Sequence, residues 1–454
     1  MQFSFFNYLR YYLGCLWTEW GGRRRIEATQ LRRLRKLVEH ARRNSPLFQE
    51  LYRDVPPTEH VRLRDLPVTR KPELMAQFDR WLTVRSLSLS QAREHMADIK
   101  NLGVPISNLA VVRTSGTSGE PAVIAVPSSV LELQAALPRA RLDKAKRKIA
   151  RHVDKAGFHV GIGAGSGHFA GNSAAQLFKK LAPRLGKRLV FIDANTPIAE
   201  IVEKLNSVEP MATLTTYPSM MELLVREKQA GRLKAEPILF TASGETLTDG
   251  LRARVRASFP NVPYPINNMY ACTECPRLGI ECSHGRQHLP EDWVILEPVD
   301  SNYRPVEDDT VSDTVLLTFL GNEVQPFIRY DLGDRIRFYS TPCPCGSPFR
   351  SFQIEGRDAT VIKLGNVSLS PLVFDLEHEG ALRVQLVQTA ETAFELRAEL
   401  LESADPDTVF AALTHSVQDV LEHNGVSNAV VRRSDKEPIV GESGKFREVI
   451  PLKK

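Results

Sequence analysis

The chain lacks the features that mark several specialised classes of protein. Its 454 residues contain no uninterrupted apolar run of about 18 residues, which a membrane-spanning helix needs. Six cysteines are too few for a disulfide scaffold at this length, so a reducing cytoplasm is the expected location. The formal net charge of +5 is too small for a polycation that binds nucleic acid.

The composition that is present is that of a globular protein, with 42% hydrophobic and 25% charged residues. This length exceeds one ordinary domain, so we expect two or three. Between about residues 150 and 270, short apolar runs alternate with helical patterns, which predicts a parallel sheet covered by helices. The predicted strands are 189–192, 212–217 and 238–242, and the predicted helices are 197–208, 218–230 and 248–258.

The last quarter of the chain has a different pattern, which predicts a small α+β domain of about 95 residues. We place its boundary near Asp358, so that residues 1–357 form a large domain and residues 358–454 a small one. Further strands are predicted at 314–319 and 335–338 in the large domain, and the small domain should contain strands 383–388, 394–400 and 429–432 and a helix over 407–423.

The first 45 residues are predicted to be helical. Aromatic and large apolar residues recur at roughly helical spacing through residues 1–20, and a basic amphipathic helix is predicted over 23–43. The simpler interpretation is that the first helix docks on its own domain. The alternative is peripheral contact with a membrane surface, because Arg23, Arg24 and Arg25 follow directly.

Residues 113–121 read RTSGTSGEP and are dense in glycine and hydroxyl side chains. Such a loop offers unobstructed backbone N–H groups and hydroxyls, which are suited to binding phosphates. The loop is not that of the P-loop NTPases, because no Lys-Ser or Lys-Thr pair follows. A flexible linker is the alternative for any such loop taken by itself.

Five further segments follow this loop in a fixed order. Each has a simple alternative interpretation, such as a capped turn or a solvated charge. They are Ser243-Gly244-Glu245, the sequence YACTE at 270–274, the sequence YDLGD at 330–334, Gly356-Arg357-Asp358, and Gly444-Lys445 near the end.

Taken together and in this order, the segments resemble the adenylate-forming superfamily of acyl-CoA ligases and peptide-synthetase adenylation domains, over nearly the whole chain. The sequence is most similar to the phenylacetate–CoA ligase and coenzyme F390 synthetase branch, on the segment 37–48, the sequence LPVTRK at 66–71 and the sequence CPCG at 343–346. The resemblance implies an α/β fold with a large adenylate-forming N-terminal domain, in which helices cover the sheets, and a small mobile α+β C-terminal domain.

The resemblance also implies roles for individual residues. Thr273 would contact the α-phosphate and Glu274 would hold Mg²⁺. Lys445 would bridge the carboxylate and the α-phosphate, a role that a mobile small domain can deliver and withdraw. The residues implied to bind ATP or AMP are Thr114, Ser115, Gly116, Thr117, Ser118 and Gly119 at the β- and γ-phosphates, Ser243, Gly244 and Glu245 beside the adenine, Tyr270, and Asp334 with Arg357 at the ribose.

The substrate pocket is less well specified by the sequence. Ala122 stands where many superfamily members have lysine, and Ala271 stands where glycine is usual, which would narrow the pocket. A pocket with histidine and few charges would suit an aromatic or hydroxylated acid. The candidate pocket residues are His159, His168, Phe169, Tyr217, Asn268 and Ala271.

Cys282, His288, Cys343 and Cys345 form two clusters of soft ligands, and a Cys₃His set suits tetrahedral zinc. Members of the resembled branch can carry such a structural zinc. The alternative is four unrelated side chains, and Cys272 and Cys275 offer a rival pair whose use would draw Thr273 and Glu274 away from ATP.

We therefore expect an ATP- and Mg²⁺-dependent ligase that activates an aryl or acyl carboxylic acid as an acyl-adenylate and releases pyrophosphate. Coenzyme A, a thiol, is the leading acceptor by resemblance, and an amine is next. The alternatives are adenylyl transfer to a phenolic hydroxyl, an inactive nucleotide-binding scaffold, and a membrane-surface protein. A homodimer is compatible with the resemblance, and no nucleic-acid partner is expected.

Overall fold

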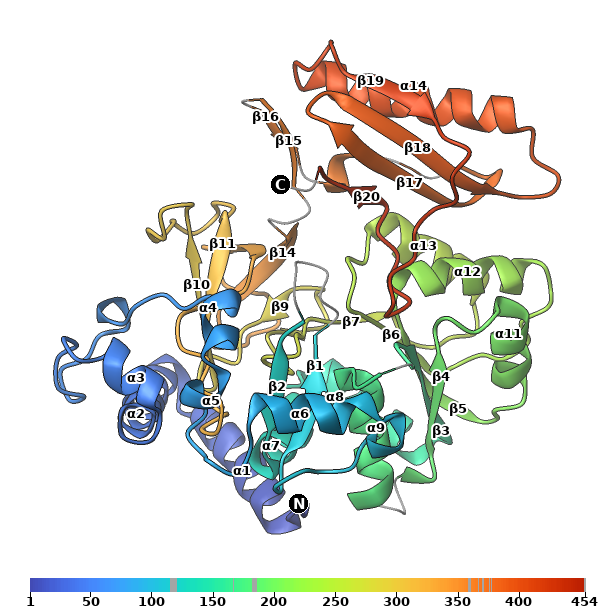
Figure 1. Cartoon of the computed structure of the whole chain (residues 1–454). Helices are drawn as coiled ribbons and strands as arrows, with labels where there is room; N and C mark the ends of the chain where they lie inside the picture. Colours follow the sequence, from blue (N-terminus) through green and yellow to red (C-terminus); the bar gives the residue numbers. More distant parts are fainter. Residues whose placement is uncertain are drawn as a thin grey trace.

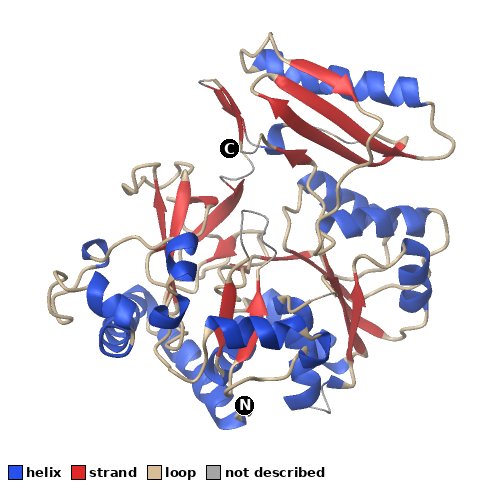
Figure 2. Ribbon diagram, viewed as in Figure 1, coloured by secondary structure: helices blue, strands red, loops and turns tan. Residues whose placement is uncertain are grey.

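The computed structural model describes residues 1–114, 121–165, 167–181, 186–357, 361–365, 367–369, 371–374, 376 and 378–452. It has a large N-terminal domain and a smaller C-terminal domain, which lies at the top of Figure 1. Both contain helices and sheets (Figure 2). The predicted fold class is therefore confirmed.

A five-stranded parallel sheet, in the order β4-β3-β5-β6-β7, forms one half of the large domain. Because β3 pairs with both β4 and β5, the winding direction reverses there, and a crevice is expected at the carboxyl ends of these strands. The predicted strands and helices between 189 and 258 are all present. The sheet and its helices are β3 Phe158–Gly163, α9 Ala170–Leu181, β4 Leu189–Asp193, α11 Ile198–Asn206, β5 Met211–Thr216, α12 Pro218–Gln229, β6 Leu239–Ser243, α13 Asp249–Ser258 and β7 Asn267–Met269.

Antiparallel sheets form the other half of the large domain. One has the order β10-β11-β12 and another the order β13-β14-β9-β8, while β1 and β2 form a ribbon on either side of the Ser/Thr/Gly loop. The strands predicted at 314–319 and 335–338 are β11 and β13. The bounds are β1 Ala110–Arg113, β2 Val123–Val126, β8 Ile280–Glu281, β9 Gln287–His288, β10 Val294–Val299, β11 Thr314–Phe319, β12 Tyr330–Asp331, β13 Asp334–Phe338 and β14 Ser351–Arg357.

Helices of the N-terminal third share a hydrophobic core with these antiparallel strands, except α8, which contacts β5 of the parallel sheet. The two predicted N-terminal helices are α1 and α2. Ser45 lies between α2 and the next helix, α3. α3 begins at Pro46, because a proline fits the first turn of a helix. The bounds are α1 Phe5–Trp20, α2 Gly22–Asn44, α3 Pro46–Leu51, η1 Leu63–Asp65, α4 Lys71–Ala76, α5 Phe78–Trp81, α6 Leu89–Ala97, η2 Ile99–Asn101, α7 Ser128–Ala140 and α8 Lys144–Lys155.

The small domain has its own hydrophobic core, built from residues between Ile362 and Val449. Its sheet has the order β19-β18-β17-β20, and α14 covers it, which agrees with the predicted α+β pattern. Asp358, the predicted boundary, lies outside the described residues. The elements are β15 Ile362–Leu364, β16 Val367–Leu369, η4 Pro371–Val373, β17 Ala381–Ala390, β18 Ala393–Leu400, α14 Pro406–His423, β19 Val430–Arg433 and β20 Val449–Ile450.

Candidate active site

The carboxyl ends of the parallel strands open into a cavity of about 2290 Å³. β3 ends at Gly163, and Tyr217, Gly244 and Tyr270 follow β5, β6 and β7; all four residues line this cavity. The small domain closes the other side, where Lys445 also lines it. Figure 1 shows the C-terminal loop descending from the small domain towards the end of β6. The cavity therefore lies between the two domains.

Asp334 is a buried acid at the start of β13 that lines this cavity. Its Oδ2 accepts a hydrogen bond from the Tyr270 hydroxyl at 2.7 Å, and its Oδ1 accepts one from Arg357 Nε at 2.8 Å. The Asp334 carboxylate raises the pKa of Arg357, so the guanidinium of this ion pair stays charged. Burial, followed by the Asp334 charge, raises the pKa of Tyr270, so its hydroxyl remains a donor. Each carboxylate oxygen retains acceptor capacity for a ligand hydroxyl.

A second buried acid, Glu274, lies in the turn after β7 and lines the same cavity beside Thr273. The hydroxyl of Tyr330, on β12, donates a hydrogen bond to Glu274 Oε1 at 3.2 Å. Carboxylate oxygens are the ligands that Mg²⁺ prefers in proteins. Glu274 is therefore held in place by a neighbouring sheet and is suited to binding a divalent cation.

Thr114 stands at the base of the Ser/Thr/Gly loop and lines the cavity. Its backbone N–H donates to Ala122 O at 3.0 Å, and its hydroxyl accepts from Ala122 N at 2.8 Å. These two bonds hold the ends of the loop together. The other five predicted phosphate-binding residues, Ser115, Gly116, Thr117, Ser118 and Gly119, lie outside the described residues.

Lys445 is carried by a tight loop in which Val440 pairs with Phe446 and Gly441 N donates to Lys445 O at 3.0 Å. Lys445 Nζ lies 5.6 Å from the centre of the Tyr217 ring. A Cβ added to Gly244 would lie 3.2 Å from Lys445 Nζ, so the small residue there leaves space for the lysine. Burial, followed by the Arg357 charge, lowers the pKa of Lys445.

Polar contacts between described residues fasten this loop to the large domain. Glu245 Oε1 accepts from Phe446 N at 3.0 Å, and its carboxylate also accepts two hydrogen bonds from Ser219. Asn195 Nδ2 donates to Glu442 O at 3.1 Å, and Arg113 Nη2 lies 3.4 Å from Glu442 Oε2. Arg113 belongs to the predicted Ser/Thr/Gly segment, but the sequence analysis gave no role or partner to Arg113, Asn195, Ser219 or Glu442, because the paired residues are far apart in the chain.

The predicted pocket residues divide into two groups. Phe169, Tyr217, Asn268 and Ala271 line the cavity, as do Ser243 and the glycines at 161 and 163. Neither His159 nor His168 is among the described residues that line the cavity, so the prediction was wrong for these two.

The two histidines have other contacts. His159 lies at the amino end of β3, away from the crevice, with Nδ1 3.1 Å from Thr213 Oγ1. His168 is buried against His95, and its Nε2 lies 3.3 Å from Asp98 O. Spacing along the chain placed these side chains near Phe169 without showing the direction in which they point.

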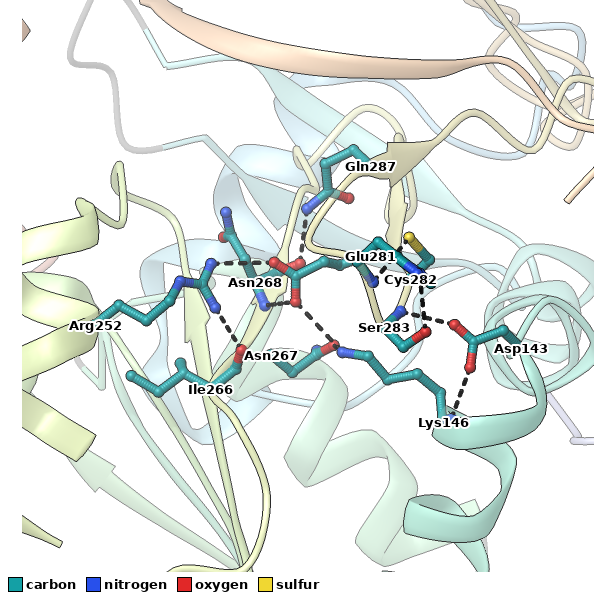
Figure 3. A network of polar contacts seen from close by, with 11 residues as sticks. Asp143, Lys146, Arg252, Ile266, Asn267, Asn268, Glu281, Cys282, Ser283 and Gln287 are labelled. Atoms are coloured by element: carbon teal, nitrogen blue, oxygen red, sulfur yellow. Dashed lines mark hydrogen bonds and ion pairs between the residues drawn. The ribbon is translucent and has the colours of Figure 1, made fainter. Parts of the chain in front are cut away.

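A network of buried charges supports β7, the strand that leads to Tyr270 (Figure 3). Glu281, on β8, accepts from Asn268 N at 3.0 Å and forms ion pairs with Arg252 at 3.1 Å and Lys146 at 3.4 Å. Lys146 also donates to Asn267 Oδ1 at 3.1 Å. The network joins α8, α13 and β8 to the strand before the active-site turn, and the sequence contained no local motif for it.

Cys282, His288, Cys343 and Cys345 converge, as predicted: one ligand atom from each lies within 4.8 Å of all the others. The sulfurs of Cys282 and Cys343 are 3.7 Å apart, which matches the ~3.8 Å expected for two thiolates on a tetrahedral zinc ion. His288 Nδ1 lies 3.0 Å from Phe349 O, so Nε2 is directed towards Cys345 Sγ at 3.3 Å. The donor set therefore fits zinc. The rival Cys272 does not belong to this cluster.

Comparisons with known proteins support the fold assignment. No family model and no curated protein matches the chain. Among solved structures, a 2-hydroxyisobutyryl-CoA ligase in the postadenylation state, in complex with R3-HIB-AMP, is similar with a TM-score of 0.66 and 20% identity, over 94% of this chain and 90% of that one. An acyl acid amido synthetase in complex with 2,4-DB is similar with a TM-score of 0.59 and 11% identity, over 94% and 92%.

A second structure of the 2-hydroxyisobutyryl-CoA ligase is also similar to the chain, with a lower TM-score. An open conformation of the same ligase, with 2-HIB-AMP and CoA, gives a TM-score of only 0.51 at 19% identity, over 94% of this chain and 91% of that one. The chain therefore has the fold of adenylate-forming ligases.

Proposed function

We propose that the protein is an ATP-dependent ligase that activates a carboxylic acid as an acyl-adenylate, releases pyrophosphate, and transfers the acyl group to a thiol such as coenzyme A or to an amine. One observation carries this proposal: Lys445 of the small domain enters the cavity that Asp334, Glu274 and the base of the Ser/Thr/Gly loop also line. The relatives of this fold include a CoA ligase and an amido synthetase, which supports both acceptors.

The chemistry accounts for this set of side chains. A carboxylate that attacks the α-phosphorus must approach a centre surrounded by negative charge, and donors and a cation reduce that repulsion. Lys445 is suited to bridging the two anions, Thr273 to donating to the α-phosphate, and Glu274 to holding Mg²⁺. Asp334, supported by Tyr270 and Arg357, is suited to accepting hydrogen bonds from the ribose hydroxyls.

The small domain would act as a lid with its boundary at residues 357 and 358. β14 of the large domain ends at Arg357, and the core of the small domain begins at Ile362. Among the described residues, polar contacts hold the Lys445 loop against the large domain, and the hydrophobic core of the small domain is separate, so the lid could open without disrupting either core. Movement about this boundary would withdraw Lys445 after adenylation.

The Cys₃His cluster would hold a structural zinc ion. It lies on β9, beside β8 and at the 343–346 turn, and its four residues do not line the cavity. Zinc would fasten the turn to the β8–β9 hairpin, whose Glu281 supports β7. A structural role suits four protein ligands, because a catalytic zinc keeps a position open for substrate.

Other predictions concern the acceptor, location and assembly of the protein. Likeness to phenylacetate–CoA ligases favours an aryl acid, and likeness to F390 synthetase keeps adenylyl transfer to a phenol as the second candidate. A cytoplasmic location and a homodimer remain predictions. The inactive-scaffold alternative is disfavoured by the joint presence of Glu274, Asp334, Arg357 and Lys445 at one cavity.

The test is pyrophosphate release from ATP across a panel of aryl, fatty, hydroxy and amino acids, with hydroxylamine present to trap acyl-adenylates. We expect release and hydroxamate formation with one class of acid. Release of pyrophosphate with a phenol and formation of a stable AMP product would favour the second candidate. Nucleotide binding without turnover of any acid or phenol would favour the scaffold.

A further inference from the structure

Helix α1 exposes a continuous apolar stripe. Phe6, Leu9, Leu13, Trp17 and Trp20 recur three or four residues apart, so they lie along one face of the helix. Trp20 is 85% exposed and Phe6 75%, and the neighbouring Phe5 is 70% exposed. Isolated surface hydrophobics are common, but an aromatic stripe along a whole helix indicates an interaction site.

The opposite face of α1 packs against the large domain. The exposed stripe is therefore not the face that packs against the core. Cys15 is fully buried and accepts from Trp293 Nε1 at 3.4 Å, and Tyr11 packs edge-on against the Trp293 ring. Arg141 donates to Cys15 O, and α1 packs along α7. The core therefore fixes which face of α1 remains exposed. α1 therefore docks on its own domain, as the simpler interpretation of the sequence predicts, and its exposed stripe is compatible with the alternative, contact with a membrane surface.

Basic side chains adjoin the tryptophan end of the stripe. The Arg25 guanidinium lies 4.1 Å from the Trp17 ring centre and 5.8 Å from that of Trp20. Arg24 and Arg10 are exposed. The acidic groups nearby are engaged: Glu27 pairs with Arg23, and Glu19 pairs with Arg141. The surface around the stripe is therefore apolar and cationic.

An anionic lipid surface matches this combination. Tryptophan and arginine side chains favour the headgroup level, while leucine and phenylalanine enter the acyl boundary. At 16 residues, α1 is shorter than the ~20 that a spanning helix needs, and among the described residues no helix has the length and apolar character to cross a bilayer. The helix would therefore lie in the plane of the surface.

We propose that the α1 stripe, with Arg24 and Arg25, docks the protein on the surface of an anionic lipid bilayer. α1 runs along the edge of the molecule opposite the small domain (Figure 1), so docking leaves the cleft and its lid uncovered. This inference concerns a separate surface and does not rest on the proposed ligase activity. A second copy of the chain is the competing occupant, and the test separates the two.

The test is sedimentation of the full chain with phosphatidylcholine vesicles that do or do not contain phosphatidylserine. The variant Trp17→Glu/Trp20→Glu changes only exposed side chains, and Val430→Glu on β19, also exposed, is the matched control. We expect binding to the phosphatidylserine vesicles alone, weakened by salt, and lowered roughly tenfold or more in the double variant but not in the control. Unchanged melting temperatures show that both variants fold.

Three results would overturn the proposal. The first is that the wild-type chain does not bind phosphatidylserine vesicles, and the second is that the double variant binds as well as the wild type. The third is that the wild type sediments as a dimer without lipid and the double variant as a monomer, because a second copy would then occupy the stripe.

Discussion

The two sides of the active-site cavity are built differently. On the large-domain side, Asp334 and Glu274 are buried and are held by hydroxyls or a guanidinium from strands and strand ends. On the small-domain side, Lys445 sits on a loop that meets the large domain through a few polar contacts. The large-domain side of the cavity is therefore preorganised, whereas Lys445 is carried by a loop that the small domain could move.

This difference indicates how the proposed reaction is divided. A preorganised acceptor set would bind the proposed nucleotide without rearrangement at each turnover. A lysine on a separable loop can favour one half-reaction and leave the cavity before the next. Variants on the two sides should therefore affect different steps.

Lys445→Ala should have the largest effect. We expect acid-dependent pyrophosphate release to fall by about 10²–10³, the usual cost of removing one donor to a developing anion. Binding of AMP should change little, because the nucleotide side is intact. Lys436→Ala is the control, since Lys436 is also in the small domain but pairs with Glu395 away from the cavity. An equal loss of pyrophosphate release in both variants would contradict a specific role for Lys445.

Asp334→Ala should have the opposite pattern. Hydrogen bonds to a charged group contribute about 1.5–3 kcal/mol, so we expect affinity for ATP and AMP to fall roughly 10- to 100-fold. The measurement is titration calorimetry with AMP, beside Asp300→Asn as a control on an exposed turn. An unchanged affinity for AMP would show that Asp334 does not bind the nucleotide, and would contradict the proposed difference between the two sides of the cavity.

Cys343→Ser tests whether the Cys₃His cluster, which lies outside the cavity, stabilises the large-domain side. We expect about one zinc per chain in the wild type and none in the variant, with a melting temperature several degrees lower. Cys272→Ser should retain the metal, because Cys272 is not in the cluster. Metal that survives in Cys343→Ser and disappears in Cys272→Ser would favour the rival pair.

The smallest expected effect is on closure of the lid without nucleotide. Burial and Arg357 lower the pKa of Lys445 in the closed arrangement, while a solvated lysine titrates near 10.5. Between these two pKa values the open form binds more protons than the closed form, so closure should become more favourable as pH rises. Small-angle scattering should show this compaction, and Lys445→Met should abolish it. If the protein instead became less compact as the pH rises, the predicted direction of the pH dependence would be wrong.

The sequence predicted the strands and helices between 189 and 258, the first two helices and the main elements of the small domain, because strand and helix periodicities extend over those whole segments. The strand predicted at 314–319 has the same bounds as β11, and the helix predicted over 407–423 differs by one residue from α14. The motif order also identified Asp334, Glu274 and Lys445 as cavity residues. The two predicted pairs of metal ligands, Cys282 with His288 and Cys343 with Cys345, are about 55 residues apart in the chain and converge in the structure.

Contacts between distant segments could not be predicted in the same way. Glu245 meets Phe446, and Glu281 meets Lys146, through folding of separate elements, and neither pair has a local spacing. His159 and His168 were predicted to be pocket residues from their place in the chain alone. The direction of a side chain depends on the position of the residue along its strand, and both point elsewhere.

The most direct test of the central claim is exchange of labelled pyrophosphate into ATP, measured for each acid without any acceptor. Reversible formation of an acyl-adenylate requires exchange that depends on both the acid and Mg²⁺ and that is lost in Lys445→Ala, and this is the result we predict. Absence of exchange with every acid, in a protein that still binds AMP through Asp334, would contradict acid activation and leave a nucleotide-binding protein of another function.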